Sequence, residues 1–200
     1  MKVNKCTTTR SQLSNAEYHL NIEQMKRIIQ AGSTLRDRII LQLLAETGLR
    51  RGEITAARIE DVRHSERLLF IRRGKGNKAR LVPLTPSFIA KMRQLIGPKI
   101  TGPIFVNPQG GPISVRQVNR IVSNAGIKAG ILSPNPKYRH ITPHLFRHSF
   151  ARLWKDRGGD IEALSNILGH QSVRTTWDTY GTMSLSGIQQ EYKRIIGKTK

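Results

Sequence analysis

The sequence predicts a mainly α-helical protein with a small antiparallel β-sheet. Several segments repeat apolar residues at helical spacing, and most of them begin at a capping residue and end at a glycine. Two β-type runs, residues 66–73 and 79–84, flank a glycine-containing turn typical of a hairpin. The chain has 200 residues and 38% hydrophobic content, which suffices for one core. We therefore expect one domain at residues 20–197 after a polar tail at residues 1–19.

Three helices are expected before the hairpin. The first begins at the capping residue Asn21, the second ends at Gly48, and the third covers residues 51–62. The third helix places Glu53 one turn beyond Arg50. Glu53 is then near enough to accept hydrogen bonds from the Arg50 guanidinium and to hold it in one orientation.

The expected hairpin turn, residues 74–78, contains Lys75, and a movable two-stranded arm can carry such a lysine into a groove. Two more helices are expected after the hairpin, at residues 86–96 and 115–130. The loop between them is rich in proline and glycine and contains one possible short strand at residues 104–106.

The next segment combines basic side chains with two further expected helices. Thr142 caps the first, which places His144 and Arg147 three positions apart on one stripe near its N-terminus. The unpaired N–H groups and partial positive charge at that end suit an anion such as a phosphate. Gly169 ends the second helix, and His170 follows it directly.

Tyr180 lies ten positions beyond His170, on a short turn that Ser172 can cap. A histidine fixed by a glycine turn and a nearby tyrosine could therefore share one phosphate. A last helix, expected at residues 186–196, has an apolar face with no evident partner in its own neighbourhood.

Charge points to a polyanionic partner. The formal net charge is +21 and the isoelectric point is near 11.2, which favours nucleic acid. Aromatic residues make up only 6%, so contact with a duplex backbone is favoured over base stacking. The single cysteine, Cys6, excludes an internal disulfide and favours a reducing cytoplasm. No signal peptide or membrane-spanning run is recognisable.

Taken in order, the segments ETGLRRGEI, RGKGNKARLVPL, HLFRHSF and LGHQS, followed by Tyr180, resemble the catalytic domain of the tyrosine recombinases, the integrase and Xer family. The resemblance covers residues 20–196 and implies the tyrosine recombinase catalytic-domain architecture. It implies site-specific DNA cleavage and strand exchange through a 3′-phosphotyrosine, without metal, ATP or another cofactor. The catalytic residues it implies are Arg50, Lys75, His144, Arg147, His170 and Tyr180, with Glu53 in a supporting role.

Phosphodiester chemistry independently calls for these residue types. Two guanidinium forks can bind the negative charge that builds on the nonbridging oxygens. The phenol of Tyr180 must lose its proton to attack, and His144 is a plausible acceptor. The leaving 5′-oxygen needs an acid, for which Lys75 is the candidate, while His170 would donate a hydrogen bond to the phosphate.

Each assignment has a competitor. Arg51 competes with Arg50, and Lys78 competes with Lys75. The spacing of His144 and His148 suggests a metal pair, but no carboxylate or cysteine completes a site, so we expect no metal. The competing tyrosines are Tyr18, Tyr138 and Tyr192. Two other functions stay open: a type IB topoisomerase-like nicking and closing enzyme, and a DNA-binding protein that does not cut.

The sequence departs from the family in two ways. The spacing from His170 to Tyr180 is one residue longer than its commonest form. Only about nineteen residues precede the first motif, so the DNA-clamping domain that most members carry is expected to be missing. We therefore expect weaker DNA affinity than that of a two-domain relative, with a steep salt dependence. The family implies a prokaryotic or viral protein acting on double-stranded DNA. It also implies a tetramer on DNA through residues 186–196, with docking inside the free monomer as the alternative.

Overall fold

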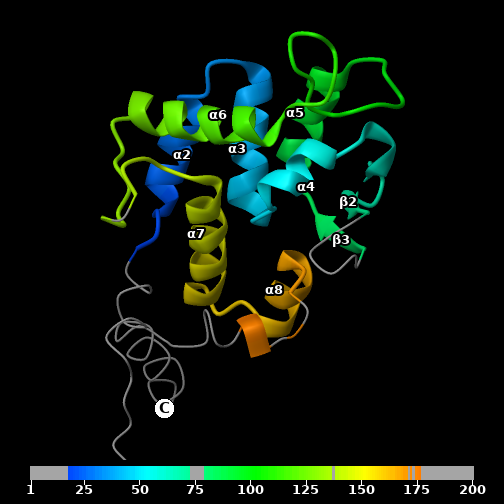
Figure 1. Cartoon of the computed structure of the whole chain (residues 1–200). Coiled ribbons are helices and arrows are strands. Elements are labelled where there is room, and N and C mark those ends of the chain that lie inside the picture. Colours follow the sequence, from blue (N-terminus) through cyan, green and yellow to red (C-terminus); the bar gives the residue numbers. More distant parts are fainter. Residues whose placement is uncertain (1–17, 73–78, 137, 171, 173, 177–200) are drawn as a thin grey trace, which may run out of the picture.

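The computed structural model describes residues 18–72, 79–136, 138–170, 172 and 174–176. Within them it is mostly helical with a small antiparallel sheet, as the sequence predicts (Figure 1). The elements are α2 (Ile22–Gln30), α3 (Leu35–Thr47), α4 (Arg51–Ala56), the 3-10 helix η1 (Ile59–Asp61), β1 (Val62–Arg63), β2 (Leu68–Ile71), β3 (Arg80–Pro83), α5 (Pro86–Ile96), α6 (Val115–Lys128), α7 (Pro143–Asp156) and α8 (Ile161–Leu168). The hairpin turn, the turn with Tyr180 and the helix expected at residues 186–196 lie outside the described residues.

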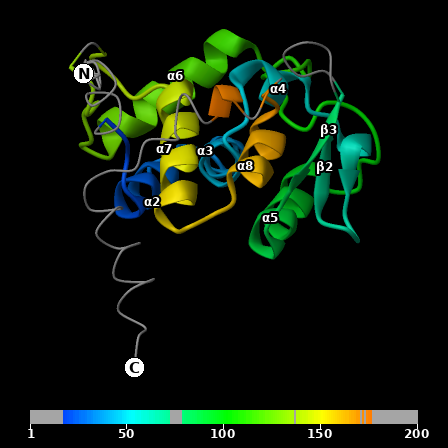
Figure 2. The ribbon, with the colours of Figure 1, turned by 90° about the horizontal axis from the view of Figure 1, so that it is seen from below.

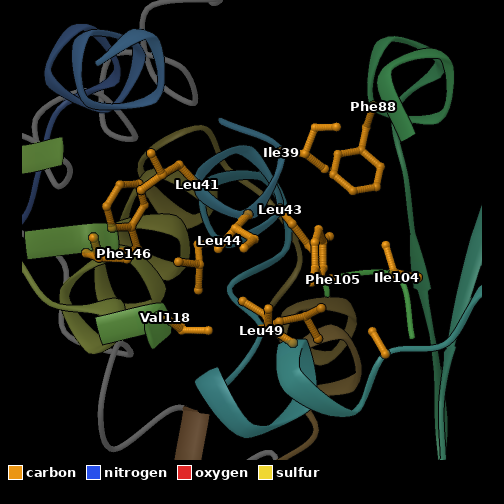
Figure 3. Close-up of a cluster of buried hydrophobic side chains, with 14 of the residues drawn as sticks. Ile39, Leu41, Leu43, Leu44, Leu49, Phe88, Ile104, Phe105, Val118 and Phe146 are labelled. Atoms are coloured by element: carbon orange, nitrogen blue, oxygen red, sulfur yellow. The ribbon is translucent and has the colours of Figure 1, made fainter. Parts of the chain in front are cut away.

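Helix α3 is the centre of the fold. Its buried apolar residues, Ile39, Ile40, Leu41, Leu43 and Leu44, cover a broad face rather than one narrow stripe, as expected when several elements pack on a helix. Leu41 faces Phe146 of α7 on one side, and Ile39 faces Phe88 of α5 on the other (Figure 3). Seen from below, α2 and α7 lie to one side of α3, and α5 and the sheet lie to the other (Figure 2). No helix in the described residues is long and apolar enough to cross a membrane.

Local capping explains where the helices begin and end. At six helix starts among the described residues, a side-chain oxygen accepts a hydrogen bond from a backbone N–H three residues further on; these residues are Asn21, Thr34, Thr85, Ser114, Thr142 and Asp160. Helix α4 differs, because its capping position is Arg50, which has no side-chain oxygen. Gly48 ends α3 and Gly169 ends α8, both in the left-handed conformation that glycine adopts at little cost. These left-handed glycines turn the chain away from the helix axis. Arg50 therefore follows the turn after α3, and His170 follows the turn after α8.

The helix predicted at residues 51–62 is wrong beyond Ala56. Ala57 is extended, and its carbonyl accepts the Ile104 N–H at 3.0 Å, while the Ile59 N–H donates to the Gly102 carbonyl at 2.8 Å. These hydrogen bonds with a later loop satisfy the backbone groups in place of a continued helix. The predicted strand at residues 104–106 is also not found, because this loop contributes only isolated bridges.

The sheet is smaller than the predicted runs but has one more strand. Its order is β1-β2-β3 and all pairs are antiparallel, with β1 absent from the prediction. Leu69 lies opposite Val82, and both are buried against the helices. Ile71 lies opposite Arg80, which places Arg80 at the end of the sheet that contacts α8 (Figure 1).

The tight packing behind Gly48 gives a stability test. A Cβ at this position would lie 2.7 Å from Phe150 Cδ1 and 2.9 Å from Leu168 Cδ2, whereas a Cβ at Gly158 would meet nothing within 4 Å. Both glycines have positive φ, so G158A controls for backbone strain. We expect G48A to lower the free energy of unfolding by about 1–3 kcal/mol more than G158A does, measured by urea denaturation. An equal loss of unfolding free energy in G48A and G158A would show that the contact between α3, α7 and α8 can relax freely.

Candidate active site

A cavity of about 710 Å³ opens between the α3–α4 junction, α6, the start of α7 and the segment after α8. Among the described residues that line it are three arginines and three histidines, and none of them is acidic. These residues are Arg50, Arg51, Arg147, His140, His144 and His170. The cavity therefore has a positive field suited to an anion, and four of the predicted catalytic residues lie on its wall.

Arg147 projects from the second turn of α7 and is almost fully buried. Its Nη1 donates to the Gly48 carbonyl at 2.8 Å, and its Nη2 donates to the Leu168 carbonyl at 2.9 Å. The Nη2 atom also lies 3.0 Å from His170 Nε2. Both carbonyls belong to helix C-termini, where a partial negative charge stabilises a guanidinium. The ends of α3 and α8 thus fix the position of this arginine.

Arg50 reaches the same point from the other side. Its Nη1 donates to the Leu168 carbonyl at 3.2 Å, so Arg50 and Arg147 share one acceptor. The predicted contact with Glu53 is present, because Arg50 Nη1 lies 3.2 Å from Oε1 and the Arg50 backbone N–H donates to Oε2 at 2.8 Å. Arg51 lines the cavity as well, but it is exposed and donates only to Asn119 at 3.4 Å among the described residues.

Arg80 is the residue that the sequence analysis missed. Its Nη1 and Nη2 donate to the two oxygens of Glu53 at 2.8 and 2.9 Å, and its Nε donates to the Ile167 carbonyl at 2.8 Å. Burial alone would raise the pKa of Glu53, but the hydrogen bonds and charges of Arg80 and Arg50 lower it below the usual 4.5. The only signal in the sequence was an arginine at the start of a short apolar strand.

His170 follows the left-handed turn at Gly169 and bridges two partners. A guanidinium can only donate hydrogen bonds, so Nε2 must accept from Arg147. The proton of the neutral ring then lies on Nδ1, which donates to the buried Thr176 hydroxyl at 2.7 Å.

His144 stands on the first turn of α7, beside the cavity. Although His144 is exposed, partial desolvation by the surrounding protein lowers its pKa below 6.5, and the positive charge of Arg147 lowers it further. The imidazole is therefore neutral at pH 7 and can accept a proton. The described residues contain no group of three histidine, cysteine, aspartate or glutamate side chains able to hold a metal ion.

Two predicted catalytic residues cannot be placed relative to the cavity. Lys75 and its competitor Lys78 fall in residues 73–78, and Tyr180 falls in residues 177–200, all outside the described residues. Among the described residues before Tyr180, residues 174–176 are helical, and Thr175 lines the cavity.

This fold and this cluster of arginines and histidines are accompanied by a family match. The chain belongs to the phage integrase family, whose model matches residues 19–184.

Individual relatives carry the Xer names. The chain is similar to the tyrosine recombinase XerC of Pelobacter propionicus, with 32% identity over 192 residues that make up 92% of this chain and 61% of that protein. It is 34% identical to the tyrosine recombinase XerD of Staphylococcus saprophyticus over 168 residues, 80% of this chain and 54% of that one. The chain thus spans little more than half the length of these relatives.

Solved structures agree with the fold. The crystal structure of XerA recombinase superposes with a TM-score of 0.74 at 30% identity, covering 88% of this chain and 64% of that chain. The XerH site-specific recombinase, in a pre-cleavage complex with its difH substrate, superposes with a TM-score of 0.67 at 23% identity, covering 87% and 53%. Both likenesses support the tyrosine recombinase catalytic-domain architecture.

The lowered pKa of Glu53 gives a pH-dependent prediction. A carboxylate with a lowered folded-state pKa adds stability above its unfolded value of about 4.5, and this stability is lost as the pH falls through the folded value. At pH 7, E53Q should lower the free energy of unfolding by about 3–5 kcal/mol, because it leaves a buried arginine without its counter-charge. In denaturation experiments between pH 7 and 3, the difference in unfolding free energy between E53Q and the unsubstituted chain should narrow only below about pH 4.5. A difference that does not change with pH would contradict the ionised state of Glu53.

Proposed function

We propose that this chain contains the catalytic domain, residues 20–197, of a site-specific DNA recombinase that cleaves and rejoins double-stranded DNA through Tyr180. The observation that carries the proposal is the convergence of Arg50 and Arg147 on one carbonyl beside His144 and His170, in a cavity lined by no acid among the described residues. A phosphodiester offers two nonbridging oxygens, which two such forks can bind bidentately.

Substrate binding follows from the donors that surround the cavity. Arg147 is held in place by backbone carbonyls, and the Nε–H of Arg50 has no hydrogen-bond partner among the described residues. A scissile phosphate entering here would take donors from both guanidiniums on its nonbridging oxygens. These donors stabilise charge that grows in the transition state, so they accelerate cleavage more than they tighten binding.

The cleavage step assigns one role to each remaining residue. The Tyr180 oxygen attacks phosphorus as its proton passes to the neutral His144, and the bond to the 5′-oxygen breaks. Lys75 supplies a proton to that oxygen. The 3′-phosphotyrosine keeps the phosphodiester energy, so a 5′-hydroxyl from another strand can displace Tyr180 by the reverse step without metal or ATP.

For His170 to donate to the phosphate, the ring must change state. In the structure its Nε2 accepts from Arg147. A phosphate beside Arg147 can take the N–H that Nη2 gives to Nε2, while the other Nη2 N–H stays on the Leu168 carbonyl. Nε2 can then bind a proton from solvent and become a donor, with Thr176 still orienting the ring. The site would thus gain a donor as it gains negative charge.

Assembly on DNA is part of the proposal. Several structural neighbours are bound to DNA, among them XerH on difH and a lambda integrase dimer on a COC′ core site. We propose a tetramer on two duplexes, joined through the expected helix at residues 186–196, in the cytoplasm of a prokaryotic or virus-infected cell. Light scattering with and without DNA separates this assembly from a monomer that docks its own terminal helix.

A nicked suicide DNA substrate tests the enzymatic function. We expect a covalent protein–DNA adduct that mass spectrometry maps to Tyr180, lost in Y180F and preserved in Y138F and Y192F. Joining of the trapped strand to a second duplex identifies a recombinase, while resealing of the same duplex alone identifies a topoisomerase. If DNA is bound but no tyrosine adduct forms, the protein is a binder and the proposal fails.

Arginine substitutions test which guanidiniums act on the phosphate. R50K and R147K remove the fork geometry and should each slow adduct formation about 10²- to 10³-fold at saturating DNA. R51K is the matched control, because Arg51 lines the same cavity but donates to Asn119 and not to the Leu168 carbonyl. Its rate should stay within about threefold of the unsubstituted chain, since it retains its positive charge. A larger defect in R51K than in R50K would exchange the two assignments.

A further inference from the structure

Arg80 occupies a place that the cleavage mechanism does not explain. Its side chain is 9% exposed and does not line the cavity, so it cannot touch a bound phosphate there. It nevertheless uses three of its five N–H donors on two different parts of the site: two on Glu53 and one on the Ile167 carbonyl. An arginine buried with this many short contacts is fixed in one conformation.

The two contacts of Arg80 lead to two different catalytic groups. Through Glu53 it reaches Arg50, because the same carboxylate oxygens accept from the Arg50 backbone and guanidinium. Through Ile167 it reaches the last turn of α8, where the Leu168 carbonyl accepts from Arg50 and from Arg147. Arg80 also packs on the turn before His170, since a Cβ at Gly169 would lie 2.8 Å from its Nη1.

We propose that Arg80 is a positioning residue of the cleavage site, which sets the orientation of Arg50 and of the α8 end that carries His170. The inference rests on the proposed function, and it adds a part to the site that lies outside the cavity. Arg80 thereby connects β3, the strand that follows the expected hairpin turn with Lys75, to the arginines proposed to bind the phosphate.

The charge on Glu53 explains why a second cation is needed beside Arg50. Without Arg80, the buried carboxylate of Glu53 has only Arg50 as a charged partner among the described residues. A buried carboxylate with half its donors missing draws the remaining guanidinium onto itself, away from the phosphate. Arg50 can serve the phosphate because Arg80 satisfies Glu53 from the far side.

The geometry also explains why lysine cannot replace it. The three bonds of Arg80 leave one planar group in directions that match a carboxylate fork and a carbonyl at once. An ammonium group can keep the charge but cannot make this flat, two-sided contact. R80K should therefore behave like R80M in cleavage, although it should be the more stable of the two.

The test compares R80K, R80M and the double variant R80M/E53Q with the unsubstituted chain. Adduct formation on the suicide substrate is followed in single turnover at saturating DNA, beside the Kd for DNA and the free energy of unfolding. We expect R80K and R80M to cleave about 10- to 100-fold more slowly, by analogy with the loss of a group that orients a metal ligand. The Kd should change by less than about threefold, because Arg80 makes no phosphate contact.

The double variant separates positioning from simple stability. Removing both buried charges should restore most of the unfolding free energy that R80M loses, so this variant remains testable even if R80M does not fold. Its cleavage should stay slow, because Arg50 has lost its oriented partner. Recovery of the cleavage rate together with stability would overturn the proposal.

A matched control is R152M. Arg152 is another buried arginine paired with a carboxylate, Asp156 at 3.1 Å, but it lies towards the far end of α7 and does not line the cavity. R152M should lose stability while its cleavage rate stays within about threefold, and a defect as large as that of R80M would overturn the proposal. If the unsubstituted chain forms no adduct, the proposed function itself fails and the inference with it.

Discussion

One buried carboxylate organises the positive charge of this protein. Glu53 accepts two hydrogen bonds from the Arg80 guanidinium and two from Arg50, and its side chain is 4% exposed. Its partners come from the α3–α4 junction and from β3, which are far apart in the sequence. A carboxylate buried so deeply is tolerated only when its oxygens are satisfied, so its presence requires that these elements meet in one geometry.

The C-terminus of α8 completes the arrangement. Three successive carbonyls accept hydrogen bonds from arginines. The Ile167 carbonyl accepts from Arg80, and the Leu168 carbonyl accepts from both Arg50 and Arg147. The Gly169 carbonyl accepts from Arg50 as well. The partial negative charge of a helix end and one carboxylate thus hold three guanidiniums that would otherwise repel one another. Because this negative charge lies behind the arginines, the cavity in front keeps a positive field for a phosphate.

The local features of this site were predictable from the sequence, but its long-range contacts were not. Helix caps, the left-handed turn at Gly169 and the pairing of Arg50 with Glu53 depend on neighbours within a few residues, and all were predictable. The extended backbone at Ala57 depends on a partner near residue 103, and the role of Arg80 depends on α8. Such long-range pairing overrides local propensity and leaves no periodic signal in a single sequence.

The most direct measurement is a crystal structure of the chain trapped on a nicked suicide DNA. The account predicts that Arg50, Arg147 and His170 donate to the nonbridging oxygens of one phosphate bonded to Tyr180, while Glu53 still lies between Arg50 and Arg80. A phosphate bound by Arg51 or His140, with Arg50 remaining on Glu53 alone, would contradict it.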